Sequence, residues 1–472
     1  MDPIQGNGYQ VWTARYGTVN VKDFGAHGDG VHDDTAAIQA AIDAAGTAGG
    51  GTVLLPQGTY SISQSLTIPY NAVTLAGPGM FSANIRVAGS FDAIVVSNSS
   101  TGTRITSLSI TSSVTQTAGA GIRADSTGNA VYTTLIDNVY FATYNGIELY
   151  NTNTTTILHC RMNCDNYGLY CGNGCRIVRF TNAEVGGNAA GVFLDGGCQS
   201  IKLLQLEMFS NAHAVVLDTP NGGSAPNYVY MYDVEANPGS DVVGPYFYIN
   251  NAGEVHLTEC WSDAAQAIQI NGGTVTILGG RYGNGGPPAI GIAGGESTTI
   301  VGASIAGVPN EGAAIVITGG GNVRVIGCIF GLFGDALAYA VTVSDTYTGD
   351  YGVQAGGTTG NILISGNSLG PTVYQIGNGY DIQCAAGLVT ITDNYGANPY
   401  GSQTAPSVPT SGTALTNPFP VNVQVVVTGG TVSSIAIDGT DTGLTSGMVM
   451  LTPGQTITLT YTAAPAWTWF GL

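Results

Sequence analysis

The sequence has few charged residues, and basic residues are the scarcest of these. Charged residues make up 9% of the 472, and only 11 Lys and Arg are present against a formal net charge of -19. A nucleic-acid groove neutralises phosphates with Lys and Arg, so nucleic acid is excluded as a partner. The same negative charge would repel an acidic glycan.

Long apolar runs and a secretory start are also missing. No stretch approaches the roughly 20 consecutive apolar residues that cross a membrane as a helix, so we expect no membrane span. The first residues, 1–8, contain neither a basic start nor an apolar segment, so no secretory signal is visible. A protein of this kind that acts outside a cell has either lost its signal or belongs to a virion released by lysis.

Cysteines occur, but not at the spacing of a typical zinc site. The closest four of the 8 cysteines form Cys-x3-Cys twice rather than Cys-x2-Cys. Two alternatives stay open: reduced thiols packed as small hydrophobic side chains, or a disulfide such as Cys171 to Cys175. We expect no cofactor and no metal, because a tight loop and a helix cap explain the crowded Asp29, Asp33 and Asp34 more simply than calcium does.

What the sequence contains instead is glycine and short apolar strands. The 71 Gly and 44% hydrophobic residues exclude disorder and indicate many turns. A small residue followed by an apolar alternation recurs at 146, 168, 191 and 214, in steps of 22, 23 and 23 residues. The pattern returns at 267, 289, 314 and 340, and each unit also has a second strand. Such a unit cannot bury its apolar face alone, so stacked units in a parallel β-helix are predicted.

The segment before the repeats contains the clearest helix, over Ala36 to Ala45. Asp33 or Asp34 is a natural N-cap, and Ile38 and Ile42 share the face that would close the open end of the solenoid. The surrounding motifs are Asp23-Phe24-Gly25-Ala26, Gly28-Asp29-Gly30, Asp33-Asp34-Thr35 and Leu55-Pro56-Gln57-Gly58-Thr59-Tyr60. Together, over 19–60, they resemble the N-terminal signature of the pectate-lyase-superfamily right-handed β-helix proteins, which include phage tail spikes and secreted glycan-degrading enzymes. That resemblance implies an all-β fold, a polysaccharide partner and a homotrimer.

The predicted domain organisation has four parts. An N-terminal extension spans 1–18, the parallel β-helix 19–395, a linker rich in Pro, Ser, Thr and Gly 396–416, and a small C-terminal β-sandwich-like module 417–472. The module resembles the terminal modules of tail proteins from phages that infect actinobacteria. This second resemblance implies trimerisation, receptor binding or contact with other virion tail proteins.

Stacked carboxylates are the candidate catalytic residues. Glycosidic bonds are usually cleaved by a pair of Asp or Glu, about 5 Å apart in retaining enzymes and about 6.5 to 9.5 Å apart in inverting enzymes. Asp195 and Asp218 follow equivalent inward leucines in consecutive repeats, so their Cα atoms should lie roughly 4.8 Å apart. A structural ladder at a strand end explains the same pair. Glu207 and Glu235 share another outward position and are the reserve pair.

Tyrosines near these acids form the candidate sugar-binding surface. They alternate outward along one strand and continue in the next repeat, and exposed aromatic rings stack on sugars; packing against a neighbouring subunit of a trimer is the alternative. The expected substrate-binding residues are Tyr228, Tyr230, Tyr232, Tyr246, Tyr248 and Glu259.

Three functions fit the sequence. The first is a virion or extracellular glycoside hydrolase that depolymerises a neutral or weakly charged surface polysaccharide. The second is a non-catalytic phage tail or receptor-binding β-helix, and the third is a secreted microbial glycan-degrading enzyme. Pectin-specific activity is poorly supported, because the Asn-Thr-Asp, Asp-Asp and Gly-His-Gly set of the polygalacturonases is absent.

Overall fold

The computed structural model divides the chain into two compact units, residues 1–264 and 265–472. The residues it describes are 17–97, 100–125, 130–187, 189–209, 212–237, 245–264, 266–283, 288–306, 313–330, 339–343, 362–367, 382–383, 389–392, 402–403, 405–419 and 422–471. The predicted N-terminal extension therefore lies almost wholly outside the described residues.

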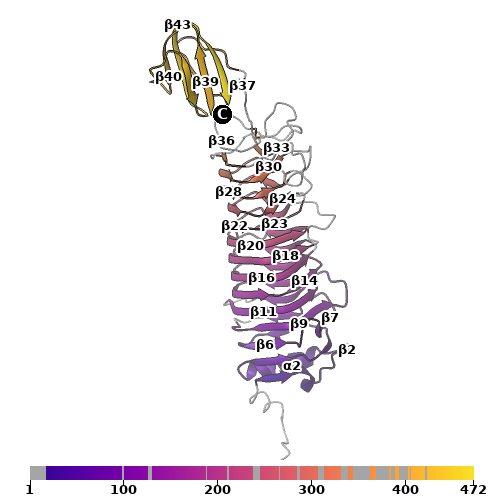
Figure 1. Ribbon diagram of the computed structural model, residues 1–472. Helices are drawn as coiled ribbons and strands as arrows, with labels where there is room; N and C mark the ends of the chain where they lie inside the picture. Colours follow the sequence, from indigo (N-terminus) through magenta and orange to yellow (C-terminus); the bar gives the residue numbers. More distant parts are fainter. Residues whose placement is uncertain are drawn as a thin grey trace, which may run out of the picture. The chain divides into compact units, whose positions relative to one another are not determined.

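Unit 1 is built from parallel strands, each paired with its equivalent one repeat later (Figure 1). Apolar residues alternate along each strand, which gives every strand a buried and an outward face. Its first sheet contains β1 (Thr18–Asn20), β2 (Asp29–Asp33), β3 (Gly51–Leu54), β4 (Gly58–Ile62), β6 (Val73–Ala76), β7 (Ala83–Val87), β9 (Arg104–Ser112), β11 (Val131–Ala142), β13 (Thr152–Leu158), β14 (Arg161–Cys164), β16 (Arg176–Gly187), β18 (Gln199–Phe209), β20 (Asn227–Asn237), β22 (Glu254–Thr258) and β23 (Trp261–Ser262). Its second sheet contains β5 (Leu66–Ile68), β8 (Ile94–Val96), β10 (Ala120–Ala124), β12 (Asn145–Leu149), β15 (Tyr167–Cys171), β17 (Ala190–Leu194), β19 (His213–Leu217) and β21 (Pro245–Ile249).

The register of the second sheet follows the repeat read from the sequence. Leu149 pairs with Cys171, Cys171 with Leu194, and Leu194 with Leu217. All four side chains are fully buried. The predicted parallel β-helix is therefore confirmed, with its core made by stacking equivalent apolar positions of successive turns.

Residues with positive φ form two columns at the corners of the first sheet. One column contains Thr133, Thr154, Ile177, Ser200 and Tyr228, and the other contains Ser107, Asn138, His159, Asn182, Gln205, Asp233 and Glu259. Their φ values lie between 49° and 62°, a left-handed conformation that only glycine adopts without cost. One such residue bends the strand while pairing continues on either side of it.

Glycines at the second position of the strands in the second sheet bring the backbone close to the core. A Cβ added to Gly146 would lie 2.5 Å from the carbonyl oxygen of Gly168 and 3.1 Å from Cys164 Sγ. One added to Gly168 would lie 2.4 Å from Val185 Cγ1. Packing thus requires a small residue at Gly146 and Gly168. The equivalent Ala214 and Tyr246 of later turns are buried, as is the residue that follows each of them.

The predicted N-terminal helix is confirmed as α2 (Thr35–Thr47), which follows the short 3-10 helix η1 (Val21–Phe24). Ile38 and Ile42 are fully buried, and the helix packs against β5 and η1. Asp34 occupies the N-cap position, but its carboxylate points back to the preceding loop. The carboxylate of Asp33 instead accepts a hydrogen bond from the backbone N–H of Thr35, at 3.0 Å.

Unit 2 also contains parallel strands, followed by antiparallel ones. The parallel strands are β24 (Gln266–Ile270), β25 (Thr274–Leu278), β26 (Arg281–Tyr282), β27 (Ile290–Ile292), β28 (Ser297–Val301), β29 (Ser304–Ile305), β30 (Ala313–Ile317), β31 (Asn322–Ile326), β32 (Ile329–Phe330), β33 (Tyr339–Val343), β34 (Ile362–Ser365), β35 (Ile382–Gln383) and β36 (Val389–Thr392). The antiparallel strands are β37 (Ser402–Gln403), β38 (Ala414–Thr416), β39 (Val423–Thr428), β40 (Thr431–Ile437), β41 (Thr440–Asp441), β42 (Gly447–Leu451), β43 (Thr456–Ala463) and β44 (Ala466–Gly471).

The antiparallel strands make two four-stranded sheets, ordered β37-β44-β39-β42 and β38-β43-β40-β41. Trp469 is fully buried there, and Trp467 packs edge-on against it at 5.4 Å between ring centroids. Two of the strands, β37 and β38, lie inside the range that the sequence assigns to a linker. Pairing with β44 and β43 orders these short segments.

The cysteines that the structure describes are free thiols buried in the core. They are Cys160, Cys164, Cys171, Cys175, Cys198, Cys260 and Cys328, while Cys384 lies outside the described residues. Of the two alternatives left open by the sequence, the reduced one holds for these seven. Among the described helices, none is long and apolar enough to span a membrane.

Candidate functional site

The first predicted pair, Asp195 and Asp218, lies where β17 and β19 end. The Leu194–Leu217 pairing puts both carboxylates at equivalent positions of adjacent turns, as the sequence predicts. Asp195 is 2% exposed, whereas Asp218 is half-buried. Each carboxylate accepts a hydrogen bond from the next backbone N–H, that of Gly196 at 2.6 Å or Thr219 at 2.8 Å.

The reserve pair, Glu207 and Glu235, lies in the other sheet. The two residues are register partners on β18 and β20, which confirms their shared position, and both are exposed. Glu184 precedes them in the same column. The two pairs belong to different sheets: Glu207 and Glu235 lie on β18 and β20, whereas Asp195 and Asp218 follow β17 and β19.

The predicted tyrosine surface is divided between the two sheets. Tyr228, Tyr230 and Tyr232 on β20 are 45%, 37% and 49% exposed, as expected. Tyr230 stacks on the ring of His256 at 4.9 Å. Glu259, also exposed, belongs to the corner column of the first sheet.

Tyr246 is a correction: it is fully buried and donates from its hydroxyl to the carbonyl of Asn237, at 3.1 Å. It occupies the strand position that is glycine in earlier turns, where two successive residues face inward. Tyr248 on β21 is half-buried and stacks on His213 at 5.6 Å, in the second sheet rather than beside Tyr230.

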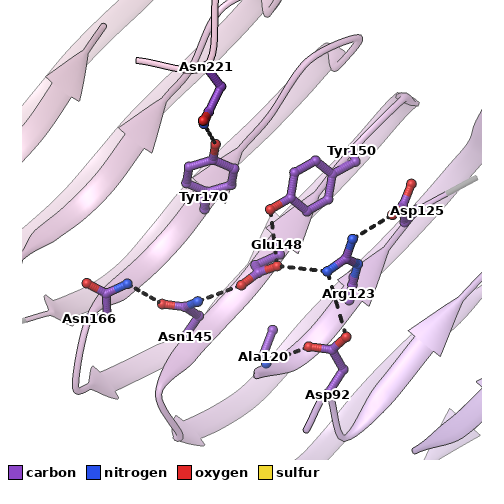
Figure 2. Close-up of polar contacts among 10 residues, drawn as sticks. All are labelled: Asp92, Ala120, Arg123, Asp125, Asn145, Glu148, Tyr150, Asn166, Tyr170 and Asn221. Carbon is purple, nitrogen blue, oxygen red and sulfur yellow. Dashed lines mark hydrogen bonds and ion pairs between the residues drawn. The ribbon is translucent and has the colours of Figure 1, made fainter. Parts of the chain in front are cut away.

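A denser polar network lies on the outward side of β10 and β12, in the column that continues into Tyr170 (Figure 2). Its centre is Arg123, whose guanidinium lies 2.8 Å from Asp125 Oδ2, 3.6 Å from Glu148 Oε2 and 3.9 Å from Asp92 Oδ2. The guanidinium also lies over the ring of Tyr150, 4.7 Å from its centroid. We name these five residues the Arg123 cluster.

Neighbouring side chains fix Glu148 within this cluster. Asn145 Nδ2 donates to Glu148 Oε1 at 2.5 Å, and the Tyr150 hydroxyl donates to Oε2 at 3.3 Å. Asn145 is itself held, since its Oδ1 accepts from Asn166 Nδ2 at 3.0 Å and from the backbone N–H of Tyr167 at 3.1 Å (Figure 2). Every hydrogen-bonding atom of Glu148 thus has a defined partner.

Asp195 is connected to this network through Tyr170. The Tyr170 hydroxyl donates to Asp195 Oδ2 at 2.5 Å, and Asn221 Nδ2 donates to the same oxygen at 2.6 Å. The ring of Tyr170 lies 5.6 Å from that of Tyr150 and 5.6 Å from that of Phe193. We name Tyr170, Asp195 and Asn221 the Asp195 cluster.

Burial controls the electrostatics of these groups. Glu148 is 8% exposed, and this desolvation raises its pKa, although Asn145 and Arg123 act in the opposite direction. Burial, reinforced by the neighbouring Glu148, also raises the pKa of Tyr150. Burial and the bond to Asp195 raise the pKa of Tyr170. Both phenols therefore stay protonated and act as hydrogen-bond donors at neutral pH.

Sequence reasoning missed the Arg123 cluster, although signals for it exist. Glu148 and Tyr170 occupy outward positions in two of the repeated strands, at the same place in each. Arg123 occupies that place one repeat earlier, 25 residues before Glu148. The repeat, extended back to β10, puts Arg123, Glu148 and Tyr170 in one column.

This arrangement has the components of a glycan site. It offers one buried carboxylate with a raised pKa, a second buried carboxylate surrounded by donors, and aromatic rings beside them. Proton transfer at a glycosidic oxygen requires carboxylates in two such different environments.

Comparison with known proteins matches the first part of the chain to a family model. Residues 18–222 match the family model for rhamnogalacturonase A/epimerase, pectate lyase-like. A segment of 80 residues is 56% identical to mannuronan C5-epimerase AlgE5 of Azotobacter vinelandii, covering 16% of this chain but only 8% of that protein. A segment of 47 residues is 57% identical to plasmin and fibronectin-binding protein A of Streptococcus pneumoniae, covering 10% of this chain and 6% of that protein.

A solved structure shares the fold. The N-terminal fragment of gene product 12 of bacteriophage Phi29 superimposes with a TM-score of 0.52 at 16% sequence identity, over 80% of this chain and 71% of that one. These two curated relatives are matched over less than a tenth of their length, so they identify a shared segment. Residues 18–222 thus match a pectate-lyase-like family, and the observed fold is the parallel β-helix that this match implies.

Proposed function

We propose that the protein is a glycoside hydrolase that binds a neutral polysaccharide on the outward side of β12, β15 and β17. The observation that carries this proposal is the pair Glu148 and Asp195. Both carboxylates are buried, at 8% and 2% exposure, and Tyr150 and Tyr170 connect them. Burying a carboxylate costs free energy, so two buried carboxylates that are fixed by hydrogen bonds beside aromatic rings indicate a functional site.

The two acids have different roles in this proposal. Glu148, whose pKa is raised by burial, is the general acid that protonates the leaving oxygen. Asp195, which accepts from Tyr170, Asn221 and a backbone N–H, is the base that activates water. Their strands are two spacings apart, roughly 9.6 Å along the stack, which is wider than the roughly 5 Å separation of a retaining pair. The pair predicted from the sequence, Asp195 and Asp218, would favour retention.

Charge supports a neutral substrate. Arg123 forms an ion pair with Glu148, and two further carboxylates lie beside its guanidinium. These three carboxylates neutralise its positive charge, so it would attract a uronate only weakly. The net charge of -19 would also repel an acidic chain. The rings of Tyr167, Tyr170 and Phe193 lie within 5.6 Å of one another and provide faces on which sugar rings stack.

We further propose that the protein acts outside a cell or on a phage virion, as a tail-spike-like homotrimer. The epimerase relative acts on mannuronan by its name, and the Phi29 protein has the same fold. Polysaccharides that a β-helix could process lie on cell surfaces. Analytical ultracentrifugation of the full chain tests the trimer directly.

The test is reducing-end release from a panel of bacterial surface glycans. We expect Glu148→Gln and Asp195→Asn each to abolish release, and Glu207→Gln, which removes an exposed acid of the other sheet, to leave it unchanged. If Asp218→Asn abolishes release while Glu148→Gln does not, the catalytic pair is the one predicted from sequence. Products with an unsaturated uronate, or inverted uronates without cleavage, would replace hydrolysis by lyase or epimerase chemistry.

A second candidate is glycan attachment without cleavage. The specific observation is that Asp195 and Asp218 each bond the next backbone N–H, as acids do in a structural turn ladder. The exposed Tyr228, Tyr230 and Tyr232 would then be the sugar-binding surface. In this case the intact protein binds a glycan and releases nothing, and Tyr230→Ala weakens binding while Glu148→Gln does not.

A further inference from the structure

The loop at the start of β2 brings together two histidines and an aspartate. His27, Asp29 and His32 each offer a ligand atom, and these atoms lie within 4.8 Å of one another. In the part of the chain that the structure describes, this is the one group of three or more potential metal ligands that meets this distance. We propose that these residues bind a divalent transition-metal ion of the Zn²⁺ type, independently of the glycan site.

Hydrogen bonds to two carboxylates hold the backbone that presents the ligands. Asp34, which is fully buried, accepts from the N–H of His27 at 2.5 Å and from the N–H of Gly28 at 3.0 Å. Asp29 Oδ1 accepts from the N–H of His32 at 3.1 Å. Gly28 has a φ of 60° and lies between the first two ligands. The positions of both histidines are thus fixed before any ion binds.

The side chains are close enough for a shared cation. His32 Nδ1 lies 2.7 Å from Asp29 Oδ2. The imidazole rings of His27 and His32 stack with centroids 4.0 Å apart. In the absence of metal, a proton bridges this nitrogen and oxygen. A metal ion takes the place of that proton, because imidazole and carboxylate coordinate in their deprotonated forms. Ligand atoms around tetrahedral Zn²⁺ lie about 3.4 Å apart, and the exposed side chains can open to that spacing by rotation.

The type of ligand selects the type of ion. Two imidazole nitrogens and one carboxylate oxygen suit Zn²⁺, Co²⁺ or Ni²⁺, with water completing the coordination. Calcium and magnesium prefer oxygen ligands alone. The charge of the loop region also favours a cation. Its three carboxylates are those of Asp29, Asp33 and Asp34, and they outnumber the two cations, Lys22 and Arg86, whose side chains donate to backbone carbonyls of the loop.

The test is calorimetric titration of the full chain, without a histidine tag, with Zn²⁺. We expect saturable binding at a single site, weakened at least about tenfold by His27→Gln and by His32→Gln. His159→Gln is the matched control, because His159 is equally exposed and pairs with Asp137 at 3.0 Å but has no second histidine beside it. Co²⁺ should give a visible absorption band that the two loop variants lose and the control keeps.

Thermal unfolding gives a readout that needs no glycan. Zn²⁺ should raise the Tm of the wild-type protein and of His159→Gln, and leave both loop variants unchanged, because an ion that binds only the folded state stabilises it. The proposal is overturned if the wild-type protein shows no saturable Zn²⁺ binding, if both loop variants bind as well as the wild type, or if His159→Gln loses binding equally. Circular dichroism establishes that each variant is folded.

Discussion

Removal of one hydroxyl, in Tyr170→Phe, tests whether the Asp195 cluster holds the second sheet together. The Tyr170 hydroxyl donates to a carboxylate that is 2% exposed, at 2.5 Å. A hydrogen bond to a charged group contributes about 1.5–3 kcal/mol, and in the variant Asn221 Nδ2 remains as the donor to the same oxygen. The ring contacts with Phe193 and Tyr150 remain in the variant. We therefore expect a loss of about 2 kcal/mol in the free energy of unfolding, or roughly a 30-fold change in the equilibrium constant.

Tyr167→Phe is the control within the same aromatic group. Tyr167 is half-buried like Tyr170 and its ring lies 5.5 Å away, but its hydroxyl has no hydrogen-bond partner among the described residues. Its removal should change the free energy by less than about 0.5 kcal/mol. Urea unfolding of the full chain measures both, with amide exchange in β15 and β17 as the local readout. Equal losses in the two variants would refute the energetic role assigned to the bond with Asp195.

Three further outcomes are expected. Gly146→Ala should cost about 1–3 kcal/mol by thermal unfolding, because its Cβ meets backbone at 2.5 Å, while Gly79→Ala, with its nearest atom at 3.5 Å, should not. Burial raises the pKa of Glu148, so the native state binds that proton more tightly than the unfolded chain. As pH rises above about 4.3, the wild-type protein should lose free energy of unfolding relative to Glu148→Gln in urea titrations. Burial raises the pKa of Cys160 and Cys260 to about 12, so thiol reagents should label them only after unfolding.

The fold could be predicted because one constraint repeats along the chain. Several turns have a glycine where the backbone nears the core, as at Gly146 and Gly168, and inward apolar residues follow it. The same period predicts that Asp195 and Asp218 are in register, as the Leu194–Leu217 pairing shows. Register depends on the period alone, so sequence gives it well.

The site could be predicted only in part, because two features break the simple alternation. Two successive residues of β21, Tyr246 and Phe247, are buried, so Tyr246 lies inside where alternation expects it outside. The polar network also depends on side-chain reach across turns, as from Arg123 to Asp92 and Glu148. Neither strand pattern nor spacing encodes that reach.

The corner columns have a consequence for the order in which the chain folds. A non-glycine residue such as Ile177 or Thr133 at positive φ costs of order 1–3 kcal/mol when isolated. A single coil in solution would therefore be unstable at these corner residues. Only the strand pairs that it forms with an adjacent coil offset the cost of the positive φ angles. Coils should add one after another onto a coil that is already formed. This growth should start at the end that α2 covers, where Ile38 and Ile42 are buried and the helix packs against the first strands. A destabilising substitution near this end should therefore slow folding more than the same substitution in a later coil.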